Sequence, residues 1–293
     1  MSYMVNDRLF WPGGKKKCLT LSYDDGVTQD IRFLEILNKA GVKATFNLNP
    51  GLFGVEGTVA AGKKEVPHIK IAADKILETY RGHEIAAHGQ LHTSMFGMDP
   101  ARCTYEILKS RNELEKLLKK PVTGFAYAFG ACDETIVAAT KASGLRYART
   151  VVSTHRFDIP QNFLLWDATC HHNDEKLPEL TEEFLSDDPY FSFYSPAKLF
   201  YVWGHAYEFD QDDNWDMFEK FIDKVSGRDD VWYATNGEIE EYVRAYRNLI
   251  FSVESDYVTN PSSIPVWIGG VFNSEILCIG PGETKELPPK QNV

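Results

Sequence analysis

Residues 19–30 have the sequence LTLSYDDGVTQD, in which an apolar run ends in two adjacent aspartates and a glycine. Neighbouring carboxylates repel each other, so Asp24 and Asp25 need a physical reason to stand together at this point. A plain turn is one interpretation, because Asp and Gly are favoured turn residues. A turn does not explain two acids directly after an apolar strand, and we therefore looked for a partner elsewhere in the chain.

Short apolar runs alternate with longer amphipathic runs from Cys18 to about Leu249, a pattern typical of repeated βα units around a parallel sheet or barrel. The expected strands lie in the runs CLTLSY, VKATFNL, HEIAAH, TGFAYAF, LRYART, FLLWDAT, KLFYVWG and VWYATN. About eight strands is near the number that closes a barrel. An α/β barrel is therefore predicted, and an open doubly wound sheet is the alternative.

Helices are expected between most of these strands. QDIRFLEILNKAG has apolar residues at Ile31, Leu34 and Leu37 and ends at a glycine. Asp99 and Pro100 signal the start of a long helix. The expected helices cover residues 29–41, 69–80, 100–120, 133–144, 215–225 and 238–249.

The chain changes character near residue 250. The tail has prolines, glycines and short β runs without a helical pattern. We expect one barrel domain over residues 1–250 and a β-rich extension over 251–293 that packs on it, because fewer than about 50 residues rarely fold alone.

Composition restricts the partners. A formal net charge of −11 disfavours nucleic acid and anionic membranes, because attraction to polyanions needs a basic face. No apolar run approaches the roughly 18 residues of a membrane span. The five cysteines have no CxxC spacing and predict neither a disulfide framework nor a thiolate zinc site. Localisation stays open: cytoplasmic if the chain is complete, exported if a leader was removed.

Polar side chains that carry chemistry in such folds lie at the carboxyl ends of the strands. Asp24 and Asp25 end the first strand, His88 ends the third, Asp167 follows FLLW, and His205 ends KLFYVWG. We therefore expect these distant residues on one rim of the barrel.

His88 and His92 are spaced i and i+4, so their imidazoles share a face if the loop turns helically. An aspartate from another strand would complete a two-histidine, one-carboxylate site. Such ligands suit Zn²⁺ best among the candidates, with Co²⁺, Ni²⁺ or Fe²⁺ as alternatives. A chance HxxxH in a chain with eight histidines is the alternative interpretation. A metal bound by one aspartate would also stabilise the second as a free base.

SYDDG, the downstream HGQLH within GHEIAAHGQLH, and WGH together resemble the polysaccharide deacetylase family, also called the NodB-homology group or carbohydrate esterase family four. The resemblance spans roughly residues 17–250. It implies a deformed (β/α) barrel of seven or eight strands, and a divalent metal used to remove N- or O-acetyl groups from sugars.

The resemblance also implies residue roles. Asp24 is the expected general base, Asp25, His88 and His92 are the expected metal ligands, and His205 is the expected proton donor to the leaving group. These roles agree with the chemistry, since metal-assisted hydrolysis needs a base and an acid on opposite sides of the reacting carbon.

Some positions depart from the family pattern. The third motif has the sequence AYAFG, with Ala126 where the family commonly has the arginine that orients the base, and Gly89 replaces a serine or threonine. A backbone N–H at Tyr127 or Ala128 is a candidate oxyanion donor. The expected substrate-binding residues are Tyr127, Phe129, Trp166, Asp167 and Glu208, and Trp166 and Asp167 are also candidates to orient His205.

The sequence therefore predicts a metal-dependent hydrolase acting on an acetylated oligo- or polysaccharide. A hydrolase of another non-peptide C–N bond, such as an imide or ureide, is one alternative, and a weakly active carbohydrate-binding relative is another. The glycan, the N- or O-acetyl preference and the oligomeric state stay open.

Overall fold

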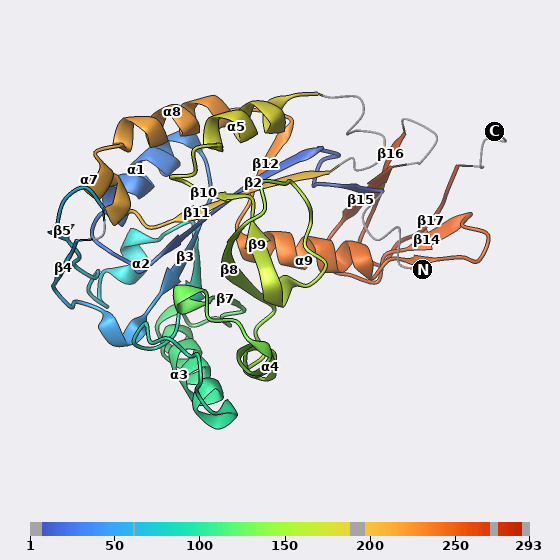
Figure 1. Ribbon diagram of the computed structural model, residues 1–293. Helices are drawn as coiled ribbons and strands as arrows, with labels where there is room; N and C mark the ends of the chain where they lie inside the picture. Colours follow the sequence, from blue (N-terminus) through green and yellow to red (C-terminus); the bar gives the residue numbers. More distant parts are fainter. Residues whose placement is uncertain (1–7, 61, 188–196, 270–274, 289–293) are drawn as a thin grey trace.

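A parallel sheet that curls into a nearly closed barrel forms the centre of the molecule (Figure 1). The computed structural model describes residues 8–60, 62–187, 197–269 and 275–288. In spatial order the strands are β10 (Cys170–His171), β11 (Lys198–Gly204), β2 (Lys17–Asp24), β3 (Thr45–Leu48), β6 (Glu84–Ala87), β7 (Gly124–Ala126), β8 (Tyr147–Ser153) and β9 (Trp166–Ala168). β12 (Val231–Tyr233) pairs with the first half of β2, beside β3.

The segment that contains β9 and β10 brings the two ends of the sheet together. β9 pairs with β8, and β10, two residues later, pairs with β11. Between them, Thr169 donates its N–H to the carbonyl of Tyr201 on β11, at 2.8 Å. The predicted α/β fold with a deformed barrel of seven or eight strands is confirmed.

Helices cover the outside of the sheet (Figure 1). They are α1 (Asp30–Ala40), α2 (Ile76–Thr79), α3 (Pro100–Leu118), α4 (Glu134–Ala142), α5 (Leu177–Leu185), α7 (Tyr207–Asp212), α8 (Trp215–Val225) and α9 (Asn236–Arg247), with short 3₁₀ turns η1 (Pro50–Leu52), η2 (Ala128–Gly130) and η3 (Phe163–Leu165). The expected Asp99 cap is present, since its carboxylate accepts from the N–H groups of Ala101 and Arg102. β2 is buried along its whole length, as expected for a strand covered on both faces.

One expected helix is much shorter than the sequence pattern indicated. Residues 69–80 were expected to be helical, whereas α2 covers only Ile76–Thr79. The preceding residues are extended because Thr28 donates to the carbonyl of Ile69 and Ile71 donates to the carbonyl of Gly26. Pairing with a distant loop therefore overrides the local helical pattern. Neither α5 nor α7 was expected, although the sequence LPELTEEFL of α5 has an amphipathic pattern.

The tail forms small antiparallel sheets. One joins β1 (Leu9–Phe10), β15 (Val266–Gly269) and β16 (Ile276–Ile279), and the other joins β13 (Ile250–Phe251), β14 (Tyr257–Thr259) and β17 (Thr284–Glu286). A β4–β5 hairpin (Thr58–Val59 and Val66–Pro67) lies elsewhere. The hydroxyl of Tyr242 on α9 donates to the carbonyl of Phe10 at 2.5 Å, which ties the first of these sheets to the barrel. The expected division near residue 250 stays a prediction, and tail residues 270–274 and 289–293 lie outside the described part.

Within the described ranges, no helix has both the length and the apolar character needed to cross a bilayer.

Candidate active site

The two adjacent aspartates point to different places because the backbone turns between them. Asp24 is the last residue of β2, whereas Asp25 has a φ of +83° and is followed by Gly26 at +65°. Such a conformation is uncommon for a residue with a Cβ and tends to occur at functional sites. The N–H of Asp25 donates to the carbonyl of Asn47 at 3.0 Å, which fixes the turn to β3.

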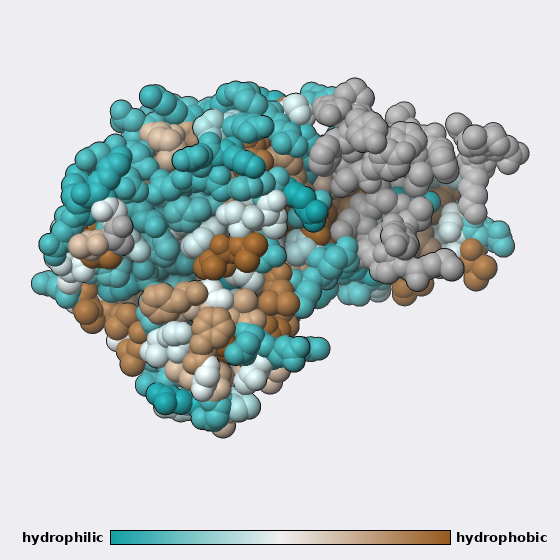
Figure 2. Space-filling view, viewed as in Figure 1, coloured by the Kyte–Doolittle hydropathy of each residue, from teal (hydrophilic) through white to brown (hydrophobic). Residues whose placement is uncertain are grey.

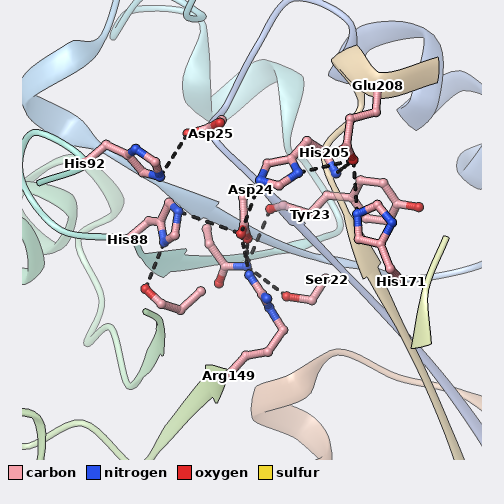
Figure 3. A network of polar contacts seen from close by, with 12 residues as sticks. Ser22, Tyr23, Asp24, Asp25, His88, His92, Arg149, His171, His205 and Glu208 are labelled. Carbon is pink, nitrogen blue, oxygen red and sulfur yellow. Dashed lines mark hydrogen bonds and ion pairs between the residues drawn. The ribbon is translucent and has the colours of Figure 1, made fainter. Parts of the chain in front are cut away.

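Asp24 is enclosed by groups that stabilise its negative charge. Its carboxylate is 2% exposed, and Oδ1 accepts from Nδ2 of Asn47 at 2.8 Å. Oδ2 accepts from Nη2 of Arg149 (Figure 3). Burial by itself raises the pKa of Asp24, but the charges of Arg149 and then His88 outweigh it and lower the pKa below its ordinary value. Asp24 is therefore an ionised, fixed carboxylate.

Arg149 was not identified by the sequence analysis, which expected the arginine at position 126. Ala126 on β7 pairs directly with Arg149 on β8, so the cation comes from the neighbouring strand. The guanidinium is fully buried and lies 4.3 Å from the ring centre of Trp203. The absence of an arginine at position 126 therefore does not leave Asp24 without a cation. The predicted strand LRYART contains Arg149, but only the register of the strands shows that this arginine lies beside position 126.

Asp25, His88 and His92 come together as expected for a metal-binding triad. One potential ligand atom from each residue lies within 4.8 Å of the others. Nδ1 of His88 lies 2.8 Å from the carbonyl oxygen of Ala126 and donates to it, which leaves Nε2 as the ligand atom. That Nε2 is buried and has no hydrogen-bond partner. A buried, unpartnered imidazole nitrogen beside a carboxylate fits a divalent transition-metal ion.

The two histidines reach this point without the helical turn that their spacing suggested. The loop from His88 to His92 is irregular, with positive φ angles of +79° at Gly89 and +52° at His92. Nδ2 of Asn49 donates to the carbonyls of His88 and Gly89, at 2.6 and 3.1 Å. Asn49 therefore anchors the loop, and glycine suits the left-handed backbone at position 89.

Burial keeps both histidines of the triad neutral near pH 7. It lowers the pKa of His88, and it lowers that of His92 to about 4, helped by repulsion from His88. Neutral imidazoles can bind a metal without first losing a proton.

Two cationic or potentially cationic side chains also contact Asp25, and neither was expected. Nζ of Lys70 lies 2.9 Å from Oδ1 of Asp25 and donates to its backbone carbonyl at 2.8 Å. Nε2 of His68 lies 3.4 Å from Oδ2. Burial raises the pKa of Asp25, but the hydrogen bond from His68 and the charge of Lys70 outweigh it and hold the pKa well below its ordinary range. Asp25 is therefore ionised, and Lys70 competes with any bound cation for it.

His205 lies on the opposite side of Asp24 from the triad (Figure 3). Its Nε2 is 3.9 Å from Oδ2 of Asp24, and its Nδ1 is 3.2 Å from Oε2 of Glu208. Burial would lower the pKa of His205, but the hydrogen bond to Glu208 and the charge of that carboxylate raise it to about 9. His205 is therefore protonated at neutral pH and can donate a proton.

Of the predicted substrate-binding residues, Phe129 is available to a ligand, whereas Tyr127 is engaged in the fold. Phe129 is 65% exposed, and its ring centre lies 4.5 Å from that of His92, so it can contact a ligand. The backbone N–H of Tyr127 donates to Arg149 at 3.0 Å and its hydroxyl to Leu164 at 2.9 Å, so Tyr127 is engaged in the fold and its N–H is not free for an oxyanion.

Trp166 and Asp167 do not take the role of orienting His205. Trp166 is 1% exposed and packs against Tyr201 and Phe163. Oδ1 of Asp167 accepts from the hydroxyl of Thr150 at 2.5 Å. Glu208, expected only as a substrate contact, is the carboxylate that faces His205. The reason is local, because Glu208 follows His205 by three residues in the first turn of α7 and its carboxylate turns back towards the imidazole.

Comparisons with known proteins were made for the whole chain. The family model for polysaccharide deacetylase matches residues 12–148. A solved structure from Mycobacterium smegmatis, assigned to the polysaccharide deacetylases, is 19% identical with a TM-score of 0.53, over 81% of this chain and 93% of that chain. The likeness supports the same fold. Among curated proteins no match was found.

Two other solved structures are less similar. A family 4 acetyl xylan esterase from Clostridium thermocellum, in complex with a cobalt ion, is 16% identical with a TM-score of 0.47, over 76% of this chain and 90% of that chain. A Streptococcus pyogenes deacetylase, in complex with acetate, is 21% identical with a TM-score of 0.39, over 45% of this chain and 55% of that chain. The match thus spans about half the length of the streptococcal protein.

Proposed function

The chain belongs to the polysaccharide deacetylase family, and on that premise we propose that it is a metal-dependent hydrolase that removes acetyl groups from an N- or O-acetylated carbohydrate. The observation that carries the proposal is the position of Asp24. Its Oδ2 lies 3.7 Å from Nε2 of His88 and 3.9 Å from Nε2 of His205. An ionised base thus stands between a metal ligand and a protonated acid.

Asp25, His88 and His92 would hold the metal ion. When bound, such an ion lowers the pKa of a water molecule towards ~7 and polarises the carbonyl of the acetyl group. Zn²⁺ suits two imidazoles and one carboxylate best, with Co²⁺, Ni²⁺ and Fe²⁺ as alternatives.

The remaining steps belong to this chain's own residues. Asp24 takes a proton from the attacking water as the water oxygen bonds to the acyl carbon. Nε2 of His205 gives its proton to the departing nitrogen or oxygen as the acyl C–N or C–O bond breaks. The products are acetate and a free amine or hydroxyl. Arg149 and Asn47 hold Asp24 in place throughout.

The surface beside the triad suits a sugar. Figure 2 shows more apolar surface on the lower part of this face, around α3, than over α5 and α8. Phe129 belongs to η2 and exposes its ring, and aromatic faces pack well on the C–H surfaces of pyranose rings.

Acetate release is the direct test. Metal-loaded protein is incubated with N-acetylglucosamine oligomers, acetylated xylan and cyclic imides, and acetate or ring opening is measured. We expect acetate from an acetylated glycan, reduced about 10²–10⁴-fold by Asp24→Asn with the bound metal retained. His88→Ala should instead lose activity together with the metal ion held by Asp25, His88 and His92.

The result also separates the alternatives. Turnover of a cyclic imide without acetate release would assign the chain to hydrolysis of another C–N bond. No turnover of any of these substrates by metal-replete protein would overturn the enzyme proposal and leave a carbohydrate-binding relative. The intact Asp24–Arg149 pair argues against that outcome.

A further inference from the structure

A second group of potential ligands lies on the side of His205 away from the triad (Figure 3). His171 ends β10 and His172 follows it, while Glu208 lies in the first turn of α7. Because His171 pairs with Trp203 in the parallel β10–β11 ladder, both strands end at the same rim. We call His171, His172 and Glu208 the histidine cluster.

The separations within the histidine cluster are those of a metal site. Oε2 of Glu208 lies 3.1 Å from Nε2 of His171 and 3.5 Å from Nε2 of His172. Ligand atoms held tetrahedrally at about 2.0–2.1 Å from a zinc ion lie about 3.3–3.4 Å apart. Ligand atoms from all three residues lie within 4.8 Å of one another.

His172 is the observation that points to a missing partner. Its side chain is 1% exposed, and neither Nδ1 nor Nε2 has a hydrogen-bond partner. The ring packs against Tyr23, with an interplanar angle of 3°, and against Phe209, at 4.2 Å between ring centres. Leaving a buried polar group unpaired costs about 1–3 kcal/mol, so such groups nearly always have a partner, which is a protein group, a water molecule or an ion.

Gly204 leaves the space in which the ring of His172 lies. A Cβ at this position would stand 2.0 Å from Nδ1 of His172. The glycine side of the ring is therefore closed, and Nε2 is the nitrogen that faces Glu208. A single ion beside Oε2 would satisfy that nitrogen together with His171.

We propose that His171, His172 and Glu208 bind a second divalent transition-metal ion, such as Zn²⁺, on the far side of Asp24 and His205 from the triad. Two imidazoles and one carboxylate suit zinc rather than calcium or magnesium. Three protein ligands would leave a coordination position for water or another ligand. The proposal does not depend on the reaction, because bound metal can be counted without any substrate.

The test disables the triad and counts what still binds. Metal-stripped His88→Ala protein is titrated with Zn²⁺ by calorimetry and with Co²⁺ by visible absorption. We expect about one equivalent, against about two for the unaltered chain. Adding His172→Gln or Glu208→Gln should weaken this binding at least tenfold.

Matched variants keep the test interpretable. His155 pairs with Asp174 at 2.6 Å outside the histidine cluster, so His88→Ala with His155→Gln should still bind one equivalent. Gly204→Ala changes none of the three ligand residues but pushes the ring of His172 out of position, and it should also weaken binding. Circular dichroism and thermal unfolding identify variants that fail to fold.

Two outcomes would overturn the proposal. Folded His88→Ala that binds no ion would mean that a buried water, not a metal, serves His172. Binding that survives both His172→Gln and Glu208→Gln would place the second ion elsewhere.

Discussion

The two flanks of the barrel mouth carry the same kinds of side chain in different surroundings. On one flank, the triad is built from loops, and Asp25 and His92 both have positive φ angles. There Asp25 is contacted by Lys70 and His68. On the other flank, the histidine cluster is built at the ends of β10 and β11, and Glu208 is contacted by imidazoles, with His205 among them.

The difference shows that donor type alone does not determine what a site does. A lysine against Asp25 competes with a cation for that carboxylate. The imidazoles around Glu208 either carry protons that balance its negative charge or bind a metal ion together with it. Asp24 lies between the two flanks and is held by Arg149, which belongs to neither. Changing each contact separately therefore shows which flank controls metal binding and which controls proton transfer.

The largest effect is expected at Arg149, because both flanks depend on Asp24. Arg149→Met leaves a buried carboxylate without its cation, which costs about 3–5 kcal/mol of the free energy of unfolding, measured by denaturant titration. Acetate release should fall about 10²-fold or more, because Asp24 loses its orientation and ionises less readily.

Adding Ala126→Arg to Arg149→Met places a cation on the neighbouring strand β7 instead of β8. It should restore part of the lost stability and part of the lost acetate release. Arg156→Met serves as the control, because Arg156 is exposed and forms an ion pair with Asp158, which is also exposed, at 2.7 Å. Wild-type stability in Arg149→Met would show that the pair with Asp24 contributes nothing.

The next effect concerns the pH dependence set by Glu208. A proton donor works below its pKa, so activity should fall as pH rises through the pKa of His205, which is about 9. Glu208→Gln removes the charge that raises this pKa, and burial then lowers it, so the alkaline fall of kcat moves to lower pH. At pH 8 the loss should be about tenfold, read from the pH profile.

Loading the histidine cluster with a metal ion should shift the profile in the same direction, since the ion offsets the charge of Glu208. Glu219→Gln, which removes an exposed carboxylate paired with Arg32, should leave the profile unchanged. An alkaline fall that stays near pH 9 in Glu208→Gln would assign proton donation to another group.

A smaller effect is expected at Lys70. Lys70→Met removes the ammonium that competes for Oδ1 of Asp25, and the affinity of the triad for Zn²⁺ should rise about tenfold. Competition with a chelator in the Glu208→Gln background measures the triad alone. Lys75→Met, which alters an exposed lysine, is the control. Weaker binding in Lys70→Met would mean that Lys70 positions Asp25.

The smallest effect is expected at Gly89. No atom lies within 4 Å of a Cβ placed there, so Gly89→Ala meets only the cost of a left-handed backbone, about 1–2 kcal/mol. Thermal unfolding should show a fall of a few degrees, with metal content unchanged. Loss of the metal in folded Gly89→Ala would show that the loop has no tolerance for a shift.

Much of the barrel could be predicted because its elements have strong local patterns. The expected helix over 215–225 has the same bounds as α8, and the expected strand at residues 18–23 lies within β2. The helix expected over residues 69–80 was wrong for most of its length, because Ile69 and Ile71 pair with the loop after Asp25 through long-range contacts. Such contacts have no trace in a local pattern.

The sequence by itself determined the kinds of chemical group and the strand ends that carry them. Asp24, Asp25, His88, His92 and His205 were identified because parallel strands bring their carboxyl ends to one rim. Only the tertiary structure decided which cation holds Asp24. Arg149 reaches Asp24 through the register of β7 and β8, which is set by pairing between distant segments and has no trace in a local spacing. Glu208 faces His205 from three residues further along the chain, so that contact was already contained in the sequence.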